Sequence, residues 1–371
     1  MSVKLTYMLQ RNERIFVNRL QKRLRKSAAF YSGENIMGTN EKKNYTIDDI
    51  ARELGVSKTT VSRAISGKGR IGKATRERVL QFIEEHDYRP NVMAKGLAQR
   101  KTYNLVLVLP VDYAATEFLF FKDCMTGICE EAARYDYDII ISMTEGSDIS
   151  QLRRQAANRK ADGMILSRAE VNSPAQEFLK ENQIPFVVIG PVEDSQVESV
   201  DNKNREASEE LTSIMLSKGI TKIALLGGKQ SYKVTESRYE GFVRAHEKAG
   251  VPIQENLIFM DIDNSEKAAD AIQKLLDEQA DGILCMDDII CGMALEYLKE
   301  RQIDIPSQLK VANLYDSRIL EKNNPSVTSV RFDTRRLGRL ACERLLELLG
   351  ENVEKEETPL NYEVILRKST Q

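Results

Sequence analysis

Short apolar runs alternate with longer amphipathic segments over most of the chain after residue 103. The runs read LVLVLP, DIIIS, GMILS, PFVVIG, KIALLGG, NLIFMD, GILCM and KVANLY. Short buried strands separated by helices of ten or more residues are typical of parallel sheets with helices on both faces. The pattern predicts an α/β fold, and the length of the region suits two doubly wound lobes.

A different pattern, with apolar residues every three or four positions, comes before this region and predicts three short helices. Thr46 and Asp49 form a T-x-x-D capping pair at the start of the first helix, and Gly55 permits the turn after that helix. Ser57 is the expected cap of the second helix, and Gly72 tolerates the cap geometry of a third. Together the three helices are expected to close a small core.

The second of these helices has two chemically different sides. Val61, Ala64 and Ile65 form an apolar stripe. The other side carries the polar residues Lys58, Thr59, Ser62 and Arg63. Two short helices joined by a glycine turn, the second with a free polar side, are typical of a helix-turn-helix that reads the DNA major groove. Lysine and arginine at such positions can donate to guanine O6 and N7.

Charge is distributed unevenly along the 371 residues, although the formal net charge is only −2. Residues 1–103 carry 22 lysines and arginines against 10 acidic residues, whereas residues 104–371 carry 32 against 46. A basic N-terminal part is attracted to nucleic-acid phosphates and an acidic remainder is repelled by them. The distribution favours a protein that contacts nucleic acid at one end.

Several features argue for the cytoplasm. No apolar run approaches membrane-spanning length, and residues 1–26 carry too many charges for the core of a signal peptide. The five cysteines, an odd number without C-x-x-C spacing, favour reduced thiols. They are Cys124, Cys129, Cys285, Cys291 and Cys342.

We expect residues 1–43 to be poorly ordered, or to be an extension that is not normally translated. Codons for Ser-Gly-Glu at residues 32–34 can read AGGAGA, a purine-rich ribosome-binding sequence, and Met37 follows closely. Met37 is therefore an alternative start. The competing interpretation is a basic amphipathic helix over residues 11–26 that contacts nucleic acid or a membrane surface.

The segments TIDDIARELGVSKTTVSRAI and YRPNVMAKGLA resemble the N-terminal headpiece of the LacI/GalR (lactose-repressor) family of bacterial transcription regulators. The shared pattern is A-x-x-x-G-V-S-x-x-T-V-S-R, then T-R-x-R-V and Y-x-P-N, and the resemblance continues to the C-terminus. It implies a headpiece over residues 44–90, a hinge helix and linker over 91–103, and an effector-binding and dimerisation domain over 104–371.

The resemblance also implies roles for individual headpiece residues. Lys58, Thr59 and Arg63 match base-reading positions, whereas Thr46, Ser62 and Asn91 match positions that hold phosphates. Ser57 and Arg70 complete the expected DNA-contacting set. Leu97 in the hinge matches a leucine that wedges between bases at the operator centre, where an apolar side chain unstacks a base step. Gly96 disfavours helix by about 1 kcal/mol relative to alanine, so the hinge is expected to be unfolded away from DNA.

For the larger domain, the resemblance implies the two lobes of a periplasmic-binding-protein-like fold, joined by three crossovers. These crossovers are expected near residues 194–200, 324–331 and 350–355. The expected N-terminal lobe comprises about 104–197 and 328–352, and the expected C-terminal lobe about 198–327 and 353–371.

Ligands of open α/β sheets bind at the carboxyl ends of the strands, so two facing lobes form a cleft there. The residues that follow the apolar runs are Asp112, Tyr113, Ser167, Arg168, Gly190, Gly228, Asp287, Asp288, Tyr315 and Asp316. Arginines and carboxylates in a cleft suit hydrogen bonds to sugar hydroxyl groups. The resemblance adds Arg238, in the stretch S-R-Y-E-G, as the first sugar-binding residue. It also matches Asp287-Asp288 to an effector-facing pair, although Asp288 as a helix N-cap is the alternative.

Two positions depart from the sugar-binding pattern of the family. Gly190 and Tyr315 stand where some members carry an aspartate. Aromatic residues can stack on a sugar face, as in maltose-type members, or belong to the core; they are Tyr113, Phe120, Phe121, Tyr232 and Tyr315. The expected effector-binding set is therefore Arg238, Asp287, Arg168, Ser167, Tyr113, Phe121 and Tyr315.

An enzyme is disfavoured because the chain has only two histidines, His86 and His246, and lacks metal-ligand spacing, G-x-S-x-G and a P-loop. No cofactor or metal is expected. The sequence predicts a homodimeric repressor of a carbohydrate-utilisation operon, which binds operator DNA and is controlled by a small sugar-like effector between the lobes. The alternative is a global carbon-catabolite regulator activated by a phosphoprotein corepressor on the lobe surface.

Overall fold

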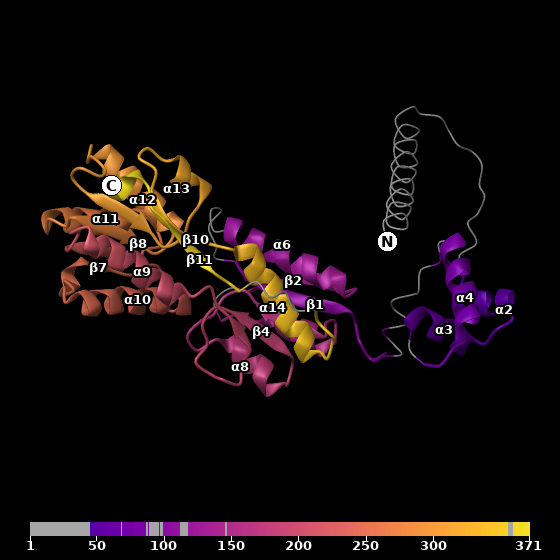
Figure 1. Ribbon diagram of the computed structural model, residues 1–371. Coiled ribbons are helices and arrows are strands. Elements are labelled where there is room, and N and C mark those ends of the chain that lie inside the picture. Colours follow the sequence, from indigo (N-terminus) through magenta and orange to yellow (C-terminus); the bar gives the residue numbers. More distant parts are fainter. Residues whose placement is uncertain are drawn as a thin grey trace, which may run out of the picture. The chain divides into compact units, whose positions relative to one another are not determined.

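The computed structural model describes residues 45–67, 69–86, 88, 96, 99–111, 118–144, 147–354 and 359–371. The chain forms two compact units that divide between Pro90 and Asn91 (Figure 1). The expectations for residues 1–43 fall outside the described residues.

The first unit contains α2 (Ile47–Leu54), α3 (Lys58–Ser66) and α4 (Lys73–Glu85). The predicted capping box is present, because the Thr46 hydroxyl accepts from the Asp49 backbone N–H at 3.2 Å and an Asp49 carboxylate oxygen accepts from the Thr46 N–H at 3.0 Å. Gly55 takes the left-handed conformation that ends α2. The fully buried residues of the small core are Ile50, Val61, Ala64 and Val79.

The first sheet of the second unit is entirely parallel, in the order β2-β1-β3-β4-β5. Its strands are β1 (Asn104–Pro110), β2 (Asp138–Thr144), β3 (Gly163–Leu166), β4 (Phe186–Ile189) and β5 (Ser199–Val200). The helices of this lobe are α6 (Phe118–Arg134), α7 (Ser150–Ala157), α8 (Pro174–Glu181) and α14 (Thr334–Leu348). Because α14 packs on α6, the last long helix of the chain completes the core of the first lobe (Figure 1).

The second sheet has the order β11-β10-β9-β8-β6-β7, and only β11 runs antiparallel to its neighbour. Its strands are β6 (Ile223–Leu226), β7 (Ile258–Phe259), β8 (Gly282–Cys285), β9 (Lys310–Asn313), β10 (Thr328–Phe332) and β11 (Tyr362–Ile365). The helices of this lobe are α9 (Asn204–Ser217), α10 (Lys233–Ala249), α11 (Ser265–Asp277), α12 (Asp288–Glu300) and α13 (Arg318–Lys322), with the short helices η1 (Glu255–Leu257) and η2 (Lys368–Thr370). The predicted α/β class with two sheets is confirmed.

The lobe boundaries differ from the sequence expectation at all three crossovers. The expected boundaries put β5 in the second lobe, but it pairs with β4; they put β10 in the first lobe, but it pairs with β9. Val353 and Leu360 pack against the first-lobe core, so the third segment also crosses later than expected. The reason is physical: a short strand beside a crossover has the same local sequence pattern whichever sheet it joins.

Candidate functional site

The outer face of α3 is the candidate DNA-reading surface. Val61 and Ala64 are fully buried against the other headpiece helices. The predicted contact residues Lys58, Thr59, Ser62, Arg63 and Arg70 are all exposed. The Lys58 ammonium lies 2.5 Å from an Asp48 carboxylate oxygen, and both side chains are largely solvent-accessible. This exposed pair constrains Lys58 little, so its donors remain available to a base edge.

The hydroxyl groups of Thr46 and Ser57 cap the N-termini of two helices. Thr46 caps α2, and the Ser57 hydroxyl accepts from the Thr60 backbone N–H at 3.1 Å at the start of α3. Both residues are exposed at helix N-termini, where backbone N–H groups and the helix dipole favour anions. Phosphate contact at these positions therefore stays a prediction.

Four predicted site residues, Asn91, Leu97, Asp112 and Tyr113, lie outside the described residues. Within the hinge, Gly96 is buried, and a Cβ there would come within 2.5 Å of the Lys101 carbonyl oxygen. The Lys101 N–H also donates to the Gly96 carbonyl oxygen at 3.0 Å. Gly96 and Gln99 are helical, and the absence of a side chain at residue 96 lets the Lys101 backbone approach closely before the first strand.

A cavity of about 230 Å³ lies between the two lobes at the carboxyl ends of the strands. Residues of both lobes line it. The predicted residues Ser167, Arg168, Gly190, Gly228, Arg238, Asp287, Asp288 and Tyr315 are among them, together with Phe120, Phe121 and Tyr232. The expectation that strand ends from the two lobes meet at one cleft is thus realised for these residues.

Arg238, on α10, is fixed by two acceptors. Its Nε donates to the Asn204 side-chain oxygen at 3.2 Å, and Nη1 donates to the Met286 carbonyl oxygen. The Asn204 amide in turn donates to Asp201 at 2.9 Å. Desolvation in the cleft lowers the pKa of Arg238, while Asp287 and Asp201 oppose this shift. The guanidinium is therefore oriented before any ligand binds.

Two adjacent carboxylates face the same cavity. Asp287 caps α12, because its Oδ1 accepts from the Ile290 backbone N–H at 2.9 Å. The alternative prediction of a cap at Asp288 is wrong by one residue, since α12 begins at Asp288. Burial raises the pKa of Asp287, and burial together with the Asp287 charge raises the pKa of Asp288 to about 6.

Aromatic rings and one arginine form another part of the wall. The Arg168 guanidinium lies 4.1 Å from the centre of the Tyr232 ring and 5.5 Å from that of Phe121. The Phe120 and Tyr315 rings, from different lobes, have centroids 6.0 Å apart. Cation–π and edge contacts hold these flat apolar surfaces in place, and such surfaces can contact the carbon-bound hydrogens of a sugar ring.

Gly190 explains one departure from the family pattern. Its φ of +119° is a conformation that L side chains rarely adopt, and a Cβ there would lie 2.9 Å from that of Ala169. An aspartate at residue 190 would therefore displace the segment that follows β3. The backbone conformation and the neighbouring Ala169 thus both favour glycine here.

Sequence reasoning missed the polar residues after β5. Asp201, Asn202 and Asn204 line the cavity. The Asn202 Oδ1 and Ser167 Oγ atoms are buried there without a hydrogen-bond partner among the described residues. The D-N-x-N run after an apolar pair was a usable signal, but the strand was assigned to the wrong lobe. Lys229, Thr235 and Asp263 were missed as well.

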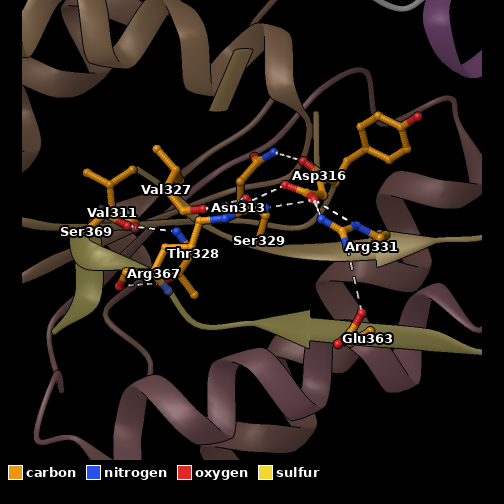
Figure 2. Close-up of polar contacts among 11 residues, drawn as sticks. Val311, Asn313, Asp316, Val327, Thr328, Ser329, Arg331, Glu363, Arg367 and Ser369 are labelled. Carbon is orange, nitrogen blue, oxygen red and sulfur yellow. Dashed lines mark hydrogen bonds and ion pairs between the residues drawn. The ribbon is translucent and has the colours of Figure 1, made fainter. Parts of the chain in front are cut away.

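Asp316 was expected at the cleft but does not line the cavity. Figure 2 shows its carboxylate between two arginines: Arg331 on β10 donates to Oδ2 from Nε and Nη2 at 3.1 and 2.9 Å, and Arg367 donates to Oδ1 and Oδ2 at 2.6 and 3.0 Å. The chain turns after Tyr315, so neighbouring residues point to different environments. Asp316 ties the β9 end to β10 and to the C-terminal segment.

A helix-turn-helix with an exposed basic face and a two-lobed domain with a cleft lined by charged and aromatic side chains define a DNA-binding regulator with a ligand site. The model of "Bacterial regulatory proteins, lacI family" matches residues 46–91, and that of "Periplasmic binding protein-like domain" matches residues 212–370. The chain therefore combines a LacI-family DNA-binding domain with a periplasmic-binding-protein-like domain. The resemblance inferred from the headpiece motif is thereby confirmed.

Similar proteins match over almost their whole length. Catabolite control protein A of Priestia megaterium is 27% identical over 334 residues, covering 88% of this chain and 99% of that protein. The structure of the transcriptional regulator CelR in complex with cellobiose is 26% identical, with a TM-score of 0.65 and coverage of 88% and 99%. A probable maltose operon transcriptional repressor, malR from Staphylococcus, is 25% identical, with a TM-score of 0.66 and coverage of 73% and 99%.

The described residues contain no helix that is long and apolar enough to cross a membrane.

Proposed function

We propose that this regulator is a cytoplasmic, homodimeric repressor of a carbohydrate-utilisation operon, without catalytic activity. A sugar-like effector between its lobes controls how tightly it holds operator DNA. The observation that carries the proposal is the exposed polar face of α3 on a LacI-family domain, in a chain that also encloses an interlobe cavity lined by both charged and aromatic side chains.

On DNA, α3 of each headpiece enters the major groove of one half-site. Lys58, Thr59 and Arg63 read base edges, and Thr46, Ser62 and Asn91 hold the phosphates on either side. Ser57 and Arg70 complete this contact set, and Leu97 wedges between bases at the centre. Two copies related by a two-fold axis match a near-palindromic operator.

The chemistry of the cleft supports a polyhydroxyl effector. Ser167 and Asn202 each bury a polar atom without a partner in the described structure, and ligand hydroxyls would satisfy both. Arg238 and Asp287 supply charged hydrogen-bonding groups, while Arg168, Phe121 and Tyr315 supply flat surfaces. The cellobiose complex of CelR and the maltose operon repressor point to the same ligand class.

Control requires that the effector bind the DNA-competent and DNA-incompetent states with unequal affinity, because only differential affinity shifts their populations. Arg238 and Asp287 belong to the second lobe, whereas Ser167 and Arg168 belong to the first. A ligand that contacts both groups favours one interlobe angle. That angle sets the spacing of the two hinges in the dimer.

A second candidate is a carbon-catabolite regulator activated by a phosphoprotein corepressor. The observation in its favour is the match to catabolite control protein A over 99% of that protein's length. In that case a protein bound to the lobe surface, and not a sugar in the cleft, would select the DNA-competent state.

Two measurements test the proposal. Selection from a pool of random DNA duplexes should enrich a near-palindromic site, and failure to enrich any sequence would refute the DNA-binding role. A thermal-shift screen against glucose, maltose, cellobiose and maltotriose should give at least one stabilising ligand, since a ligand of the folded state raises its stability.

The variant Arg238→Ala should abolish that shift. Arg244→Ala is the matched control, because Arg244 is exposed on the same helix and does not line the cavity. A shift that survives Arg238→Ala would remove Arg238 from the effector site. No shift with any sugar would favour the corepressor candidate.

A further inference from the structure

Two loop segments from opposite lobes pair directly beside the cavity. One segment, residues 168–171, follows β3, and the other, residues 229–233, leads into α10. Glu170 and Tyr232 form an antiparallel β-bridge. The Val171 N–H donates to the Ser231 carbonyl at 2.9 Å, and the Lys233 N–H donates to the Ala169 carbonyl at 3.1 Å. We call these two segments the strap.

Side chains reinforce the strap from both lobes. The Lys233 ammonium lies 2.6 Å from a Glu193 carboxylate oxygen in the loop after β4, and 2.7 Å from Glu236 on its own helix. Inside the cleft, the Arg168 guanidinium covers the Tyr232 ring at 4.1 Å. The strap therefore joins the lobes through backbone, ion-pair and cation–π contacts together.

The position of the strap relates it to the cavity. Arg168, Ala169, Lys229 and Tyr232 all line the cavity, so the strap forms part of its wall. Ala169 packs against Gly190, where a Cβ would lie 2.9 Å from the Ala169 Cβ, so glycine at residue 190 allows this part of the wall to form. The crossovers also link the lobes covalently, and the Phe120 and Tyr315 rings approach one another between the lobes with centroids 6.0 Å apart.

We propose that the strap is a latch of the interlobe cleft, which holds the lobes closed without a ligand and separates when the cleft opens. The ion pair and the bridge are individually weak. Glu193 is 83% exposed, so its ion pair contributes little to stability, and the bridge has only two backbone hydrogen bonds. A closure made of several weak contacts is reversible. That the latch admits an effector rests on the proposed function; that it controls cleft opening does not.

The first test compares two carboxylates that bind the same lysine. Glu193→Gln removes the pair between the lobes, whereas Glu236→Gln removes a pair within α10 and is the matched control. Amide hydrogen exchange is measured by mass spectrometry on peptides containing Val171 and Lys233. Glu193→Gln should accelerate exchange there by up to about five-fold, the ceiling for an exposed ion pair. Exchange with Glu236→Gln should be unchanged or slower.

The second test locks the latch reversibly. Glu170 and Tyr232 are the non-hydrogen-bonded residues of an antiparallel bridge, so their Cα atoms are expected roughly 4.5 Å apart, within the range for a disulfide. The double variant Glu170→Cys/Tyr232→Cys is made in a Cys129→Ser background, because Cys129 is the exposed cysteine among the described residues. Exchange is followed at residues 288–290, which line the cavity.

In the oxidised variant, exchange at residues 288–290 should slow at least several-fold, and a reducing agent should restore it. Equal exchange in the oxidised and reduced forms would show that the cleft opens without the strap and would overturn the proposal. Failure of the disulfide to form under mild oxidation, or equal effects of Glu193→Gln and Glu236→Gln, would do the same. Neither test uses a ligand, so the absence of any sugar response would refute the proposed effector while leaving the latch intact.

Discussion

At the scale of single residues, Asp288 is a buried carboxylate whose negative charge destabilises the folded protein. Its pKa is raised from 3.8 to about 6, mainly by burial and then by Asp287. Between these two pH values the folded protein binds more protons at this group than the unfolded chain does. The contribution of Asp288 to stability therefore falls as pH rises from about 4 to 6, and the cost is fully present above pH 6.

Asp288→Asn removes this titration. Relative to the parent protein, the free energy of unfolding of the variant should rise between pH 4 and pH 7, by on the order of 1–3 kcal/mol for a shift of this size. Urea denaturation at the two pH values measures the difference. A difference between variant and parent that is the same at both pH values would contradict the raised pKa.

Arg63 and Ser62 are neighbours on α3 with different expected roles. Arg63→Ala should weaken binding to the selected operator by about 1–3 kcal/mol while changing affinity for random duplex little, because it removes a base contact. Ser62→Ala should weaken both similarly, because a phosphate contact carries no sequence information. Fluorescence anisotropy at a fixed salt concentration compares the two DNAs. If Arg63→Ala weakened binding to the operator and to random duplex equally, Arg63 would contact the DNA phosphates and not a base.

At the scale of elements, the contact between α6 and α14 depends on two glycines. A Cβ at Gly127 would overlap the Arg335 carbonyl oxygen, and a Cβ at Gly338 would overlap the Cys124 carbonyl oxygen. The absence of both side chains lets the two helix backbones approach closely. This contact joins two helices that lie about two hundred residues apart in the sequence and completes the first-lobe core.

Gly338→Ala should lower the free energy of unfolding by several kcal/mol, as overpacking of a rigid backbone contact costs at least about 1–3 kcal/mol. Gly292→Ala is the control, since Gly292 lies within α12 and a Cβ there would meet nothing within 4 Å. That change should be neutral or stabilise by up to about 1 kcal/mol through helix propensity. Thermal unfolding of both variants measures these changes. If Gly338→Ala left the free energy of unfolding unchanged, α6 and α14 would be able to move apart at little cost.

Local patterns predicted the elements well, because caps, turns and apolar periodicity act within a few residues. The Thr46–Asp49 capping box, the Ser57 cap and the strand ends at Ser167 and Tyr315 all depend on such local signals. Whether a strand belongs to the first or the second lobe does not depend on such local signals. The sequence TSVRF of β10 would suit either lobe, and its pairing with β9 and β11 assigns it to the second.

The same limit explains the errors at the cleft. Asp316 follows a strand end as Asp287 does, yet Arg331 and Arg367 draw its carboxylate away from the cavity. These arginines lie on β10 and after β11, far along the chain, so no local pattern indicates the ion pairs. Asn202 and Asn204 were missed for the related reason that β5 was assigned to the other lobe.

At the scale of the whole molecule, regulation requires that the linker before β1 respond to the lobes. Lys101 in this linker donates to the Leu349 carbonyl oxygen at 3.3 Å and forms an ion pair with Glu351. The Tyr137 hydroxyl donates to the same Glu351 carboxylate at 3.1 Å. Glu351 follows α14 on the first lobe, in the segment that leads to the third crossover. We therefore expect a movement of that segment to reach the linker through Lys101.

Glu351→Gln should therefore loosen the linker without unfolding the lobes. Trypsin cleavage after Arg100, an exposed residue beside Lys101, should accelerate by roughly three- to ten-fold, because the variant loses a partly buried charged pair worth about one kcal/mol. Glu354→Gln is the matched control, since Glu354 is 85% exposed and pairs with Arg134. If both variants were cleaved at the parent rate, the linker would be ordered independently of the crossover, and the signal to the headpiece would have to leave the lobes by another route.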